Sequence, residues 1–251
     1  MTPDQLKKRI IELADTCFYK DILTYTPFLT PEEQDIFLRM QREIKGVRFL
    51  LTGGYEAAER RLVLFLPSYL EEDSLSPHPI AWVCVRPADA RFAEPLTHRD
   101  YLGAVMSLGI ERDRTGDIIV AENAAHIAVL RSLSGYLCEN LLSVKHTRVA
   151  AEEEPLPDSL RKPSLREITG TVASVRLDAL IGTAFRMARG TSQDTIKAGY
   201  VFIDGRQTLS PSASVKPGSV ISVRHRGKFA YLGEEGTSKK GRTVIRLGIY
   251  T

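Results

Sequence analysis

Closely spaced turn signals after residue 173 permit only short helices and strands in the C-terminal part of this chain. Ser174 is a candidate N-cap for a first helix, which Gly190 ends. The motif Thr191-x-x-Asp194 is a candidate start for a second helix, which Gly199 closes. The apolar residues between these signals predict two short helices packed on a small sheet.

Two turn dipeptides mark the strands of that sheet. Asp204-Gly205 is a strong signal for a two-residue hairpin and follows the predicted strand 200–203, and Pro217-Gly218 precedes the predicted strand 219–224. This arrangement leaves a set of basic side chains for the surface: Arg176, Arg186, Arg189, Lys197, Arg206 and Arg224. Guanidinium groups suit phosphate because their N–H donors can form bidentate hydrogen bonds to two phosphate oxygens. This surface is therefore suited to a nucleic acid.

The distribution of charge supports the same partner. Residues 1–160 carry 18 Lys or Arg and 25 Asp or Glu, a net of −7, whereas residues 161–251 carry 16 and 6, a net of +10; together these give the +3 of the whole chain. A small domain this basic indicates a polyanionic partner. A surface that serves only solubility is the alternative.

The first 150 residues mix helices and strands. Helix starts are predicted at Thr2 and Thr30, and Thr97 with Asp100 fits a capping box. Apolar runs predict strands at 47–51, 62–66, 80–85, 118–120, 127–130 and 147–149, with a hairpin across Glu122-Asn123 and a further helix over 134–142. Because the strands and helices do not alternate strictly, the sequence predicts an α+β fold.

A candidate linker follows this part. Residues 151–165 read AEEEPLPDSLRKPSL, with three prolines and an acidic run, and the sign of the charge changes just beyond them.

The C-terminal motifs resemble the S4 RNA-binding domain, also called the αL motif. They are Arg176-Leu177-Asp178, Ala188-Arg189, Ile196-x-x-Gly199-x-Val201, Asp204-Gly205 and Val215-x-x-Gly218. Three positions depart from the usual pattern, namely Ala188 for Ser, Asp204 for Asn and Ser219 for Asp. The first departure removes a hydroxyl that can contact phosphate, and the other two lie in turns.

Motifs over the rest of the chain resemble the YlmH family, which is related to the photosystem II S4 domain proteins. These motifs are Thr52-Gly53-Gly54-Tyr55-Glu56 with Glu59-Arg60, His98-Arg99-Asp100 with Leu102-Gly103-Ala104, Leu108-Gly109-Ile110, Gly116-Asp117-Ile118, Gly227-Lys228-Phe229 and Lys239-Lys240-Gly241-Arg242. The resemblance implies binding to ribosomal RNA of the large subunit. Some members are implicated in ribosome-associated quality control, where they hold peptidyl-tRNA on a split large subunit.

The resemblance also implies a domain plan. We expect an N-terminal α+β domain at 1–75, a central RRM-like RNA-binding domain at 76–150, a linker at 151–167 and an S4 domain with a C-terminal strand extension at 168–251. The expected RNA contacts in the S4 domain are Arg176, Arg186, Arg189, Thr191, Ser192, Lys197, Arg206, Arg224, Arg226, Lys228, Lys239, Lys240 and Arg242.

Several candidates keep a structural alternative. Arg176 is suited to RNA or to pairing with Asp178, and Phe229 to stacking on a base or to the core. His98, Arg99 and Arg112 are candidate RNA contacts of the central domain, within a local basic set that adds Arg86, Arg91 and Arg114. The alternative for His98 and Arg99 is stabilisation of a helix start.

Two other functions compete with a binding protein. Pseudouridine synthases and some RNA methyltransferases carry the same αL domain, but here the chain ends about 27 residues after Arg224 and has no G-x-G nucleotide loop suited to S-adenosylmethionine. A cell-division scaffold is the third possibility, which apolar surface on the N-terminal half would favour.

The remaining features agree with a cytoplasmic monomer that uses no cofactor or metal. Cys17, Cys84 and Cys138 are odd in number, widely spaced and without a CxxC motif, which argues against disulfides and zinc. No apolar run approaches the roughly 18 residues that span a bilayer, and the N-terminus lacks the apolar core of a secretory signal. We therefore expect no membrane partner. As a binding protein, the chain is also expected to have no catalytic residues.

Overall fold

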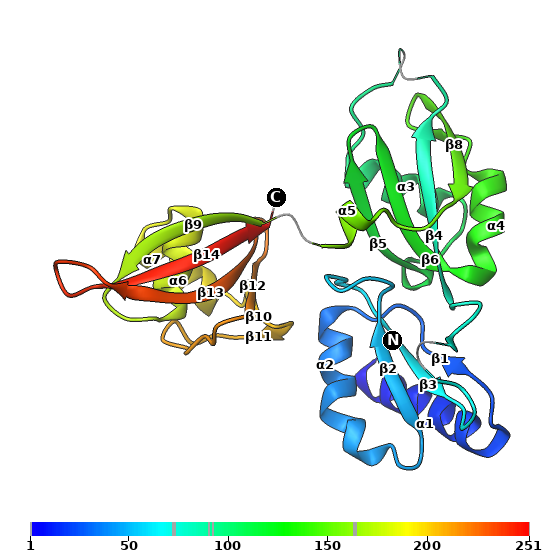
Figure 1. Cartoon of the computed structure of the whole chain (residues 1–251), viewed down its shortest axis with the longest axis horizontal. Coiled ribbons are helices and arrows are strands. Elements are labelled where there is room, and N and C mark those ends of the chain that lie inside the picture. Colours follow the sequence, from blue (N-terminus) through cyan, green and yellow to red (C-terminus); the bar gives the residue numbers. More distant parts are fainter. Residues whose placement is uncertain (1, 72–73, 90, 92, 163–164, 251) are drawn as a thin grey trace. The chain divides into compact units, whose positions relative to one another are not determined.

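The computed structural model describes residues 2–71, 74–89, 91, 93–162, 165–250. The chain divides into two compact units, unit 1 at Met1–Lys162 and unit 2 at Pro163–Thr251 (Figure 1). Within the described residues, the strands form three antiparallel sheets accompanied by helices, which confirms the predicted α+β class.

Unit 1 begins with two helices whose starts the sequence predicted. Thr2 and Thr30 each form a capping box, so their hydroxyls satisfy amides that the first helical turn leaves free. The helices lie against a three-stranded sheet of order β1-β3-β2 and share its apolar core. The elements are α1 Pro3–Lys20, β1 Thr24–Tyr25, α2 Pro31–Met40, η1 Gln41–Glu43, β2 Arg48–Thr52 and β3 Leu62–Leu66.

A five-stranded sheet of order β5-β6-β4-β8-β7 forms the rest of unit 1. Its elements are β4 Ile80–Pro87, α3 His98–Ser107, η4 Arg112–Arg114, β5 Thr115–Ala121, β6 Ala124–Leu130, α4 Arg131–Asn140, β7 Ser143–Val144 and β8 Thr147–Glu153. This succession of strands and helices is a βαββαβ unit. Tyr101 of α3 and Leu137 of α4 pack on the sheet face that carries Val83 and Ile127.

The other face of this sheet is also buried. Trp82 and Ala128, which alternate with the helix-covered residues, pack with Phe28 and with Leu62 and Leu64 of β3. Trp82 is only 8% exposed. RRM domains stack bases on the open face of such a sheet, and here the N-terminal elements cover that face.

Asp117 ties the two sheets of unit 1 together. Its carboxylate accepts hydrogen bonds from the Tyr55 hydroxyl at 2.8 Å and from the backbone amides of Glu59 and Arg60 at 2.6 and 3.0 Å. Asp117 lies in β5, and the side chains of Tyr55 and Arg60 are half-buried beside it, so these motif residues serve the packing of unit 1. Burial and the neighbouring Asp117 carboxylate raise the pKa of Tyr55.

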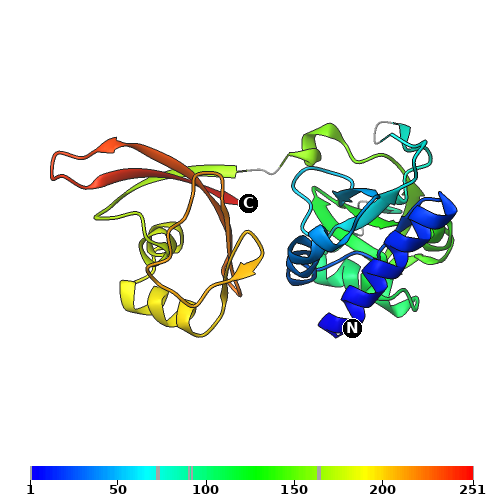
Figure 2. The same ribbon diagram turned by 90° about the horizontal axis from the view of Figure 1, so that it is seen from below.

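Unit 2 packs two helices on one face of a six-stranded sheet of order β11-β10-β12-β13-β14-β9 (Figure 2). Leu177, Leu180 and Ile181 of α6 and Ile196 of α7 form its core with the strand residues. The elements are β9 Leu165–Val172, α6 Leu177–Phe185, α7 Arg189–Lys197, β10 Val201–Ile203, β11 Arg206–Gln207, β12 Val220–Val223, β13 Gly227–Thr237 and β14 Thr243–Tyr250.

Both helix starts predicted in unit 2 are wrong by two or three residues. Helix α6 starts at Leu177 rather than after Ser174, because the carbonyls of Ala213 and Pro211 accept from the amides of Leu177 and Asp178. A distant loop therefore caps this helix and Ser174 does not.

The boundary between α6 and α7 also differs from the prediction. Arg186 closes α6 in the left-handed region with φ 52°, so Gly190 does not end it and lies inside α7. The predicted turns Gly199 and Asp204-Gly205 are confirmed.

The predicted linker 151–167 is largely structured where it is described. It contains the end of β8, the helix α5 Asp158–Arg161 and the start of β9, and Leu156 is buried in unit 1. The division into three domains stays a prediction.

Candidate nucleic-acid interface

A buried carboxylate organises the basic residues at the start of α6 and α7. Asp178 is 1% exposed, and its two oxygens accept from Arg176 Nε and Nη2, both at 3.1 Å. The Gln193 amide donates to it at 2.9 Å, and Arg189 Nε lies 3.5 Å away. The alternative given for Arg176, pairing with Asp178, is observed, and the pairing leaves this guanidinium partly exposed, so the predicted RNA contact of Arg176 stays a prediction.

The electrostatics of this cluster favour an ionised carboxylate. Burial alone would raise the pKa of Asp178, but the hydrogen bonds from Arg176 and Gln193 and the charges of Arg176 and Arg189 outweigh it and lower the pKa to about 2. Asp178 is therefore charged at neutral pH and holds two arginines on neighbouring helices.

The first turn of α7 is open to an acceptor from outside. Ala188 is its N-cap and makes no side-chain cap hydrogen bond among the described residues. A Cβ added at Gly190 would meet nothing within 4 Å, so the chain leaves open space beside this residue of the first turn. Arg189, Thr191 and Lys197 are exposed on α7.

Ser192 is a correction to the predicted contact set. Its side chain is fully buried, and its hydroxyl donates to the Ala188 carbonyl at 3.3 Å. The preceding residue, Thr191, is exposed, but Ser192 lies about 100° further around the helix and faces the interior. Ser192 therefore belongs to the interior of unit 2, and we no longer count it as an RNA contact.

Further candidates lie on the turn between β12 and β13 and at the start of β13. Arg224 and Arg226 are exposed, Lys228 is half-buried, and the Arg224 guanidinium lies 5.1 Å from the centre of the Phe202 ring. Phe229 is fully buried and packs edge-to-face on Phe185. The core role is therefore confirmed for Phe229, and the stacking role is wrong.

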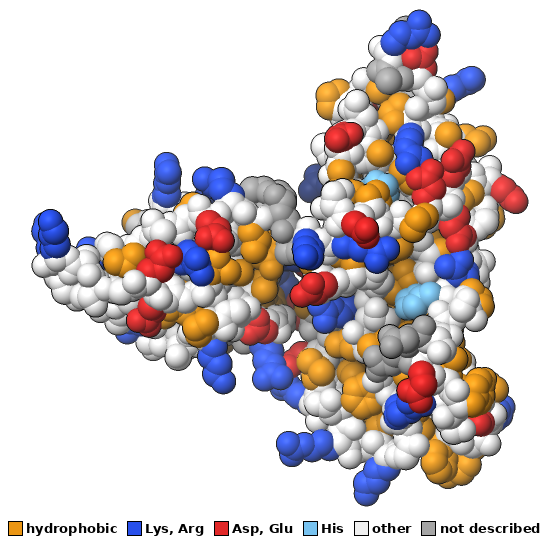
Figure 3. Space-filling model, in the orientation of Figure 1, with side chains coloured by type: hydrophobic (Ala, Val, Ile, Leu, Met, Phe, Trp, Pro, Cys, Tyr) orange, Lys and Arg blue, Asp and Glu red, His pale blue; other side chains and the backbone are white. Residues whose placement is uncertain are grey.

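The other predicted contacts are spread around unit 2. Arg186 is exposed at the end of α6 and Arg206 on β11. Lys239, Lys240 and Arg242 are exposed on the turn that joins β13 and β14, where Arg242 Nη2 donates to the Thr171 carbonyl at 3.1 Å. On the face shown in Figure 3, blue Lys and Arg side chains project from the rim of unit 2.

Of the three candidate contacts expected in the central domain, Arg112 is engaged within unit 1, whereas His98 and Arg99 are exposed. Arg112 Nη1 donates to the carbonyls of Thr115 and Gly116 at 2.7 and 3.0 Å, so it is a structural residue at the start of β5. His98 and Arg99 are exposed at the start of α3. The side chain of His98 is exposed overall, but partial desolvation of its ring, and then the charge of Arg112, lower the pKa of His98.

The local basic set around these residues is largely neutralised. Arg86 forms a bidentate ion pair with Glu154, with N–O distances of 2.7 and 2.6 Å. Arg91 pairs with Asp89 at 2.8 Å. Arg114 lies 3.7 and 3.6 Å from carboxylates of Glu111 and Asp113. Exposed positive charge is therefore sparser here than on unit 2.

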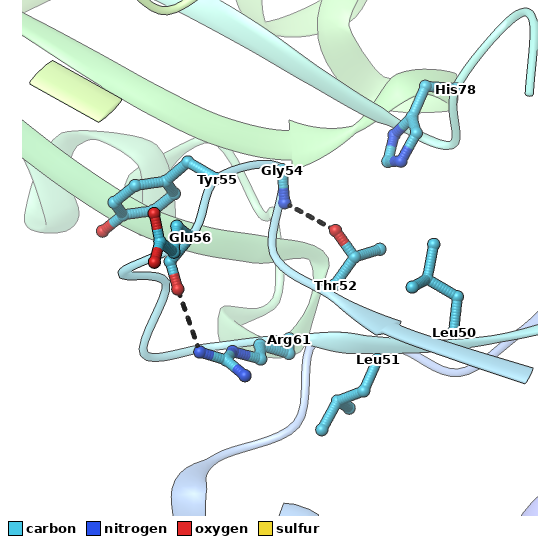
Figure 4. Close-up of a pocket in the computed structure, with 8 residues that line it drawn as sticks. All are labelled: Leu50, Leu51, Thr52, Gly54, Tyr55, Glu56, Arg61 and His78. Atoms are coloured by element: carbon cyan, nitrogen blue, oxygen red, sulfur yellow. Dashed lines mark hydrogen bonds between the residues drawn. The ribbon is translucent and has the colours of Figure 1, made fainter. Parts of the chain in front are cut away.

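A pocket of about 400 Å³ opens beside the Gly53-Gly54 turn (Figure 4). Its polar groups make structural hydrogen bonds: His78 Nδ1 accepts from the Ile80 amide at 3.0 Å, and Arg61 donates to the Ala58 and Glu56 carbonyls at 2.8 and 3.2 Å. Within the described residues, no group of three or more His, Cys, Asp or Glu is placed to hold a metal ion, and no helix is long and apolar enough to cross a membrane.

Comparisons with known proteins point to a single family. Residues 87–158 match the family described as "Putative RNA-binding domain in YlmH". The chain is similar to "Ribosome-associated protein quality control protein P2" of Bacillus subtilis (strain 168), with 32% identity over 219 residues, which covers 86% of this chain and 83% of that protein. Among solved structures it is similar to "Cell division protein ylmH from Streptococcus pneumoniae", with 25% identity and a TM-score of 0.49, over 61% of this chain and 90% of that one. Because the Bacillus relative is matched over most of its length and the family's own domain is recognised in the middle of the chain, this protein belongs to the YlmH family.

Proposed function

We propose that this protein binds ribosomal RNA of the large subunit without catalysing a reaction, through the α6–α7 side of unit 2. The observation that carries the proposal is the Asp178 cluster, in which one buried carboxylate holds Arg176 and Arg189 beside the uncapped start of α7. Fixed guanidinium groups next to free backbone N–H groups suit phosphate oxygens.

Double-stranded RNA is the form of nucleic acid that such a surface suits. An A-form helix hides its base edges in a deep, narrow groove, so proteins read it through its shape, its phosphates and its 2′-hydroxyls. The exposed Arg189 and Lys197 lie at opposite ends of α7, whose 9 residues span about 13 Å at 1.5 Å per residue. Side chains at both ends of the helix can therefore reach different phosphates.

The cellular role that we propose follows the named relative. The Bacillus protein is called a ribosome-associated quality control protein, and the family description refers to RNA binding. We therefore propose that this chain acts in ribosome-associated quality control in the cytoplasm, with tRNA as a second RNA partner. Arg99, exposed on the matched segment, is the residue of unit 1 best suited to an additional RNA contact.

Charge reversal on α7 tests the proposed function. In co-sedimentation with purified 50S and 30S subunits over a salt series, we expect the wild type to bind 50S selectively. The double variant Arg189→Glu/Lys197→Glu should bind about 10-fold more weakly or worse, because it removes phosphate contacts and adds repulsion. The slope of log affinity against log salt should fall by about 2.

A matched charge change in unit 1 is the control. Lys7 and Lys8 are exposed on α1, so Lys7→Glu/Lys8→Glu alters the net charge equally without touching α7. Equal loss in both double variants would mean that only the net charge matters. Binding by the α7 variant at wild-type strength, or no wild-type binding to either subunit, would contradict the proposed function.

Binding to a protein partner is a second candidate function. Apolar surface at the end of α1 favours it. Tyr19 is 80% exposed and Ile22, just after the helix, is 46% exposed. Tyr19 lies on the side of α1 opposite Ile10 and Cys17, which pack in the core. An exposed apolar patch of this kind is typical of a protein-binding surface.

The variant Tyr19→Glu/Ile22→Glu separates this candidate from RNA binding. If the patch binds a protein component of the large subunit, 50S co-sedimentation should fall about 10-fold, because charges would enter an apolar interface. Affinity for naked ribosomal RNA should stay unchanged. Unchanged 50S binding would remove this candidate.

A further inference from the structure

Tyr200 is an aromatic side chain that unit 2 leaves on its surface. Among the described residues of this unit, Tyr200 and Leu209 are the large apolar side chains that are exposed, and Tyr200 is 44% exposed. Phe202, Phe229 and Tyr231 are all buried. The Tyr200 ring therefore does not serve the core as its aromatic neighbours do.

The fold places a second ring beside Tyr200. The rings of Tyr200 and His225 have centroids 6.2 Å apart and an interplanar angle of 76°, an edge-to-face pair. In such a pair the edge of one ring covers only one face of the other, and both side chains are exposed to solvent. His225 is exposed on the turn between β12 and β13.

The backbone on both sides of the pair is fixed. Gly199 closes α7 with φ 78°, and the Arg224 amide donates to the Tyr200 carbonyl at 2.9 Å. His225 adopts φ 64°, a left-handed conformation that side-chain-bearing residues rarely adopt. The turn conformation therefore holds the imidazole next to Tyr200 at some cost in backbone strain.

Positive charge flanks the two rings. Arg224 and Arg226 are exposed on either side of His225, and Lys197 is exposed in the last turn of α7 just before Tyr200. The Arg224 guanidinium lies over the Phe202 ring, 5.1 Å from its centre. Planar rings among cationic side chains are the combination that binds unpaired nucleotides, because the rings stack on the base and the cations attract its phosphate.

We propose that Tyr200 and His225 form a stacking site for one unpaired RNA base, next to the surface of α7 that binds duplex phosphates. This inference rests on the proposed function and narrows its ligand to an RNA helix with an unpaired nucleotide at its side or end. Base edges inside an A-form helix are inaccessible, whereas an unpaired base can leave the stack and lie on an aromatic ring.

The test compares two synthetic RNA hairpins that differ at one position. One carries a single bulged adenosine, and the other carries an abasic residue there. We expect wild-type protein to bind the adenosine hairpin about 5- to 100-fold more tightly, because stacking of one base accounts for a difference of this size. With 2-aminopurine at the bulge, its emission should change on binding.

Substitutions at Tyr200 and His225 test whether these two rings cause the preference for the adenosine hairpin. Tyr200→Ala should abolish the preference for adenosine and leave affinity for the abasic hairpin unchanged, whereas Tyr200→Phe should retain the preference. His225→Gly removes the imidazole and suits the left-handed turn, so it tests the second ring without loss of the fold and should reduce the preference.

Two results would overturn the stacking site: equal wild-type affinity for both hairpins, or the same preference for adenosine in Tyr200→Ala and His225→Gly as in wild type. Failure of the proposed function gives a different result. In that case the wild type binds neither hairpin, or its affinity for each hairpin equals that of the variant Arg189→Glu/Lys197→Glu. If Tyr200 and His225 contact protein instead, Tyr200→Ala and His225→Gly should weaken binding to 50S subunits. Their affinities for both hairpins should then equal those of the wild type, which overturns the stacking site.

Discussion

Replacing Asp178 by asparagine is expected to weaken RNA binding, although it raises the net charge of the chain from +3 to +4. Bulk electrostatics alone predicts stronger binding for a more positive protein. However, the carboxylate fixes Arg176 through two hydrogen bonds of 3.1 Å and attracts Arg189 at 3.5 Å. An uncharged amide cannot hold both guanidinium groups, so their orientation toward phosphate is lost. The sign of the change in hairpin affinity decides between the two effects.

The same substitution should change stability in a pH-dependent way. The folded-state pKa of Asp178, about 2, lies below the roughly 3.9 of an unfolded aspartate, so the ionised group stabilises the fold above about pH 4. This contribution is lost as pH falls from about 4 through 2. We expect Asp178→Asn to be about 2 kcal/mol less stable than wild type at pH 7, and the difference to vanish near pH 2.

The difference in the free energy of unfolding is measured by urea denaturation, with hydrogen exchange of the α6 amides as the probe. Asp194→Asn is the matched control, because Asp194 is exposed on the neighbouring helix and the substitution makes the same change in charge. It should leave stability and RNA affinity close to wild type. If Asp178→Asn matched this control in both measurements, the carboxylate would not be a positioning group.

Replacing Gly116 by alanine is expected to destabilise unit 1 by about 3 kcal/mol. A Cβ at this position would lie 2.6 Å from Phe28 Cε1 and 2.9 Å from Ala128 Cβ. Both neighbours are fully buried between the two sheets, so neither can move aside without displacing other core residues. Trp82 belongs to the same apolar cluster, and its fluorescence reports the loss of packing during urea denaturation.

Gly103→Ala provides a control of opposite sign. Gly103 is exposed in the middle of α3, and a Cβ there would meet nothing within 4 Å. Alanine has the higher helix propensity, so this variant should be about 0.5–1 kcal/mol more stable than wild type. Wild-type stability for Gly116→Ala would show that the close packing between the sheets does not limit the fold.

Local patterns in the sequence predicted the features that depend on neighbouring residues. The helix starts at Thr2, Thr30 and Thr97 are confirmed because a capping box joins residues only three positions apart. The hairpins at Glu122-Asn123 and Asp204-Gly205 are confirmed because the turn conformation depends on the dipeptide itself. The charge difference between the two parts of the chain is likewise a property of composition.

Features that join distant segments did not follow from these patterns. The Tyr55–Asp117 hydrogen bond spans 62 positions, and no local signal marks Asp117 as its acceptor. The start of α6 depends on carbonyls of Pro211 and Ala213, which no rule for residues near Ser174 includes. The inward direction of Ser192 and Phe229 depends on the core that surrounds them.

The sequence by itself determined that this chain is an α+β protein with a basic C-terminal part that resembles an RNA-binding domain, because capping, turns and charge are local or additive properties. Only the tertiary structure decided that N-terminal elements bury the open face of the central sheet, that Asp178 holds two arginines, and that Tyr200 meets His225. The burial of the sheet face and the Tyr200–His225 pair depend on contacts between segments far apart in the chain. The Asp178 cluster depends on the packing of α7 beside α6, which brings Arg189 to the carboxylate.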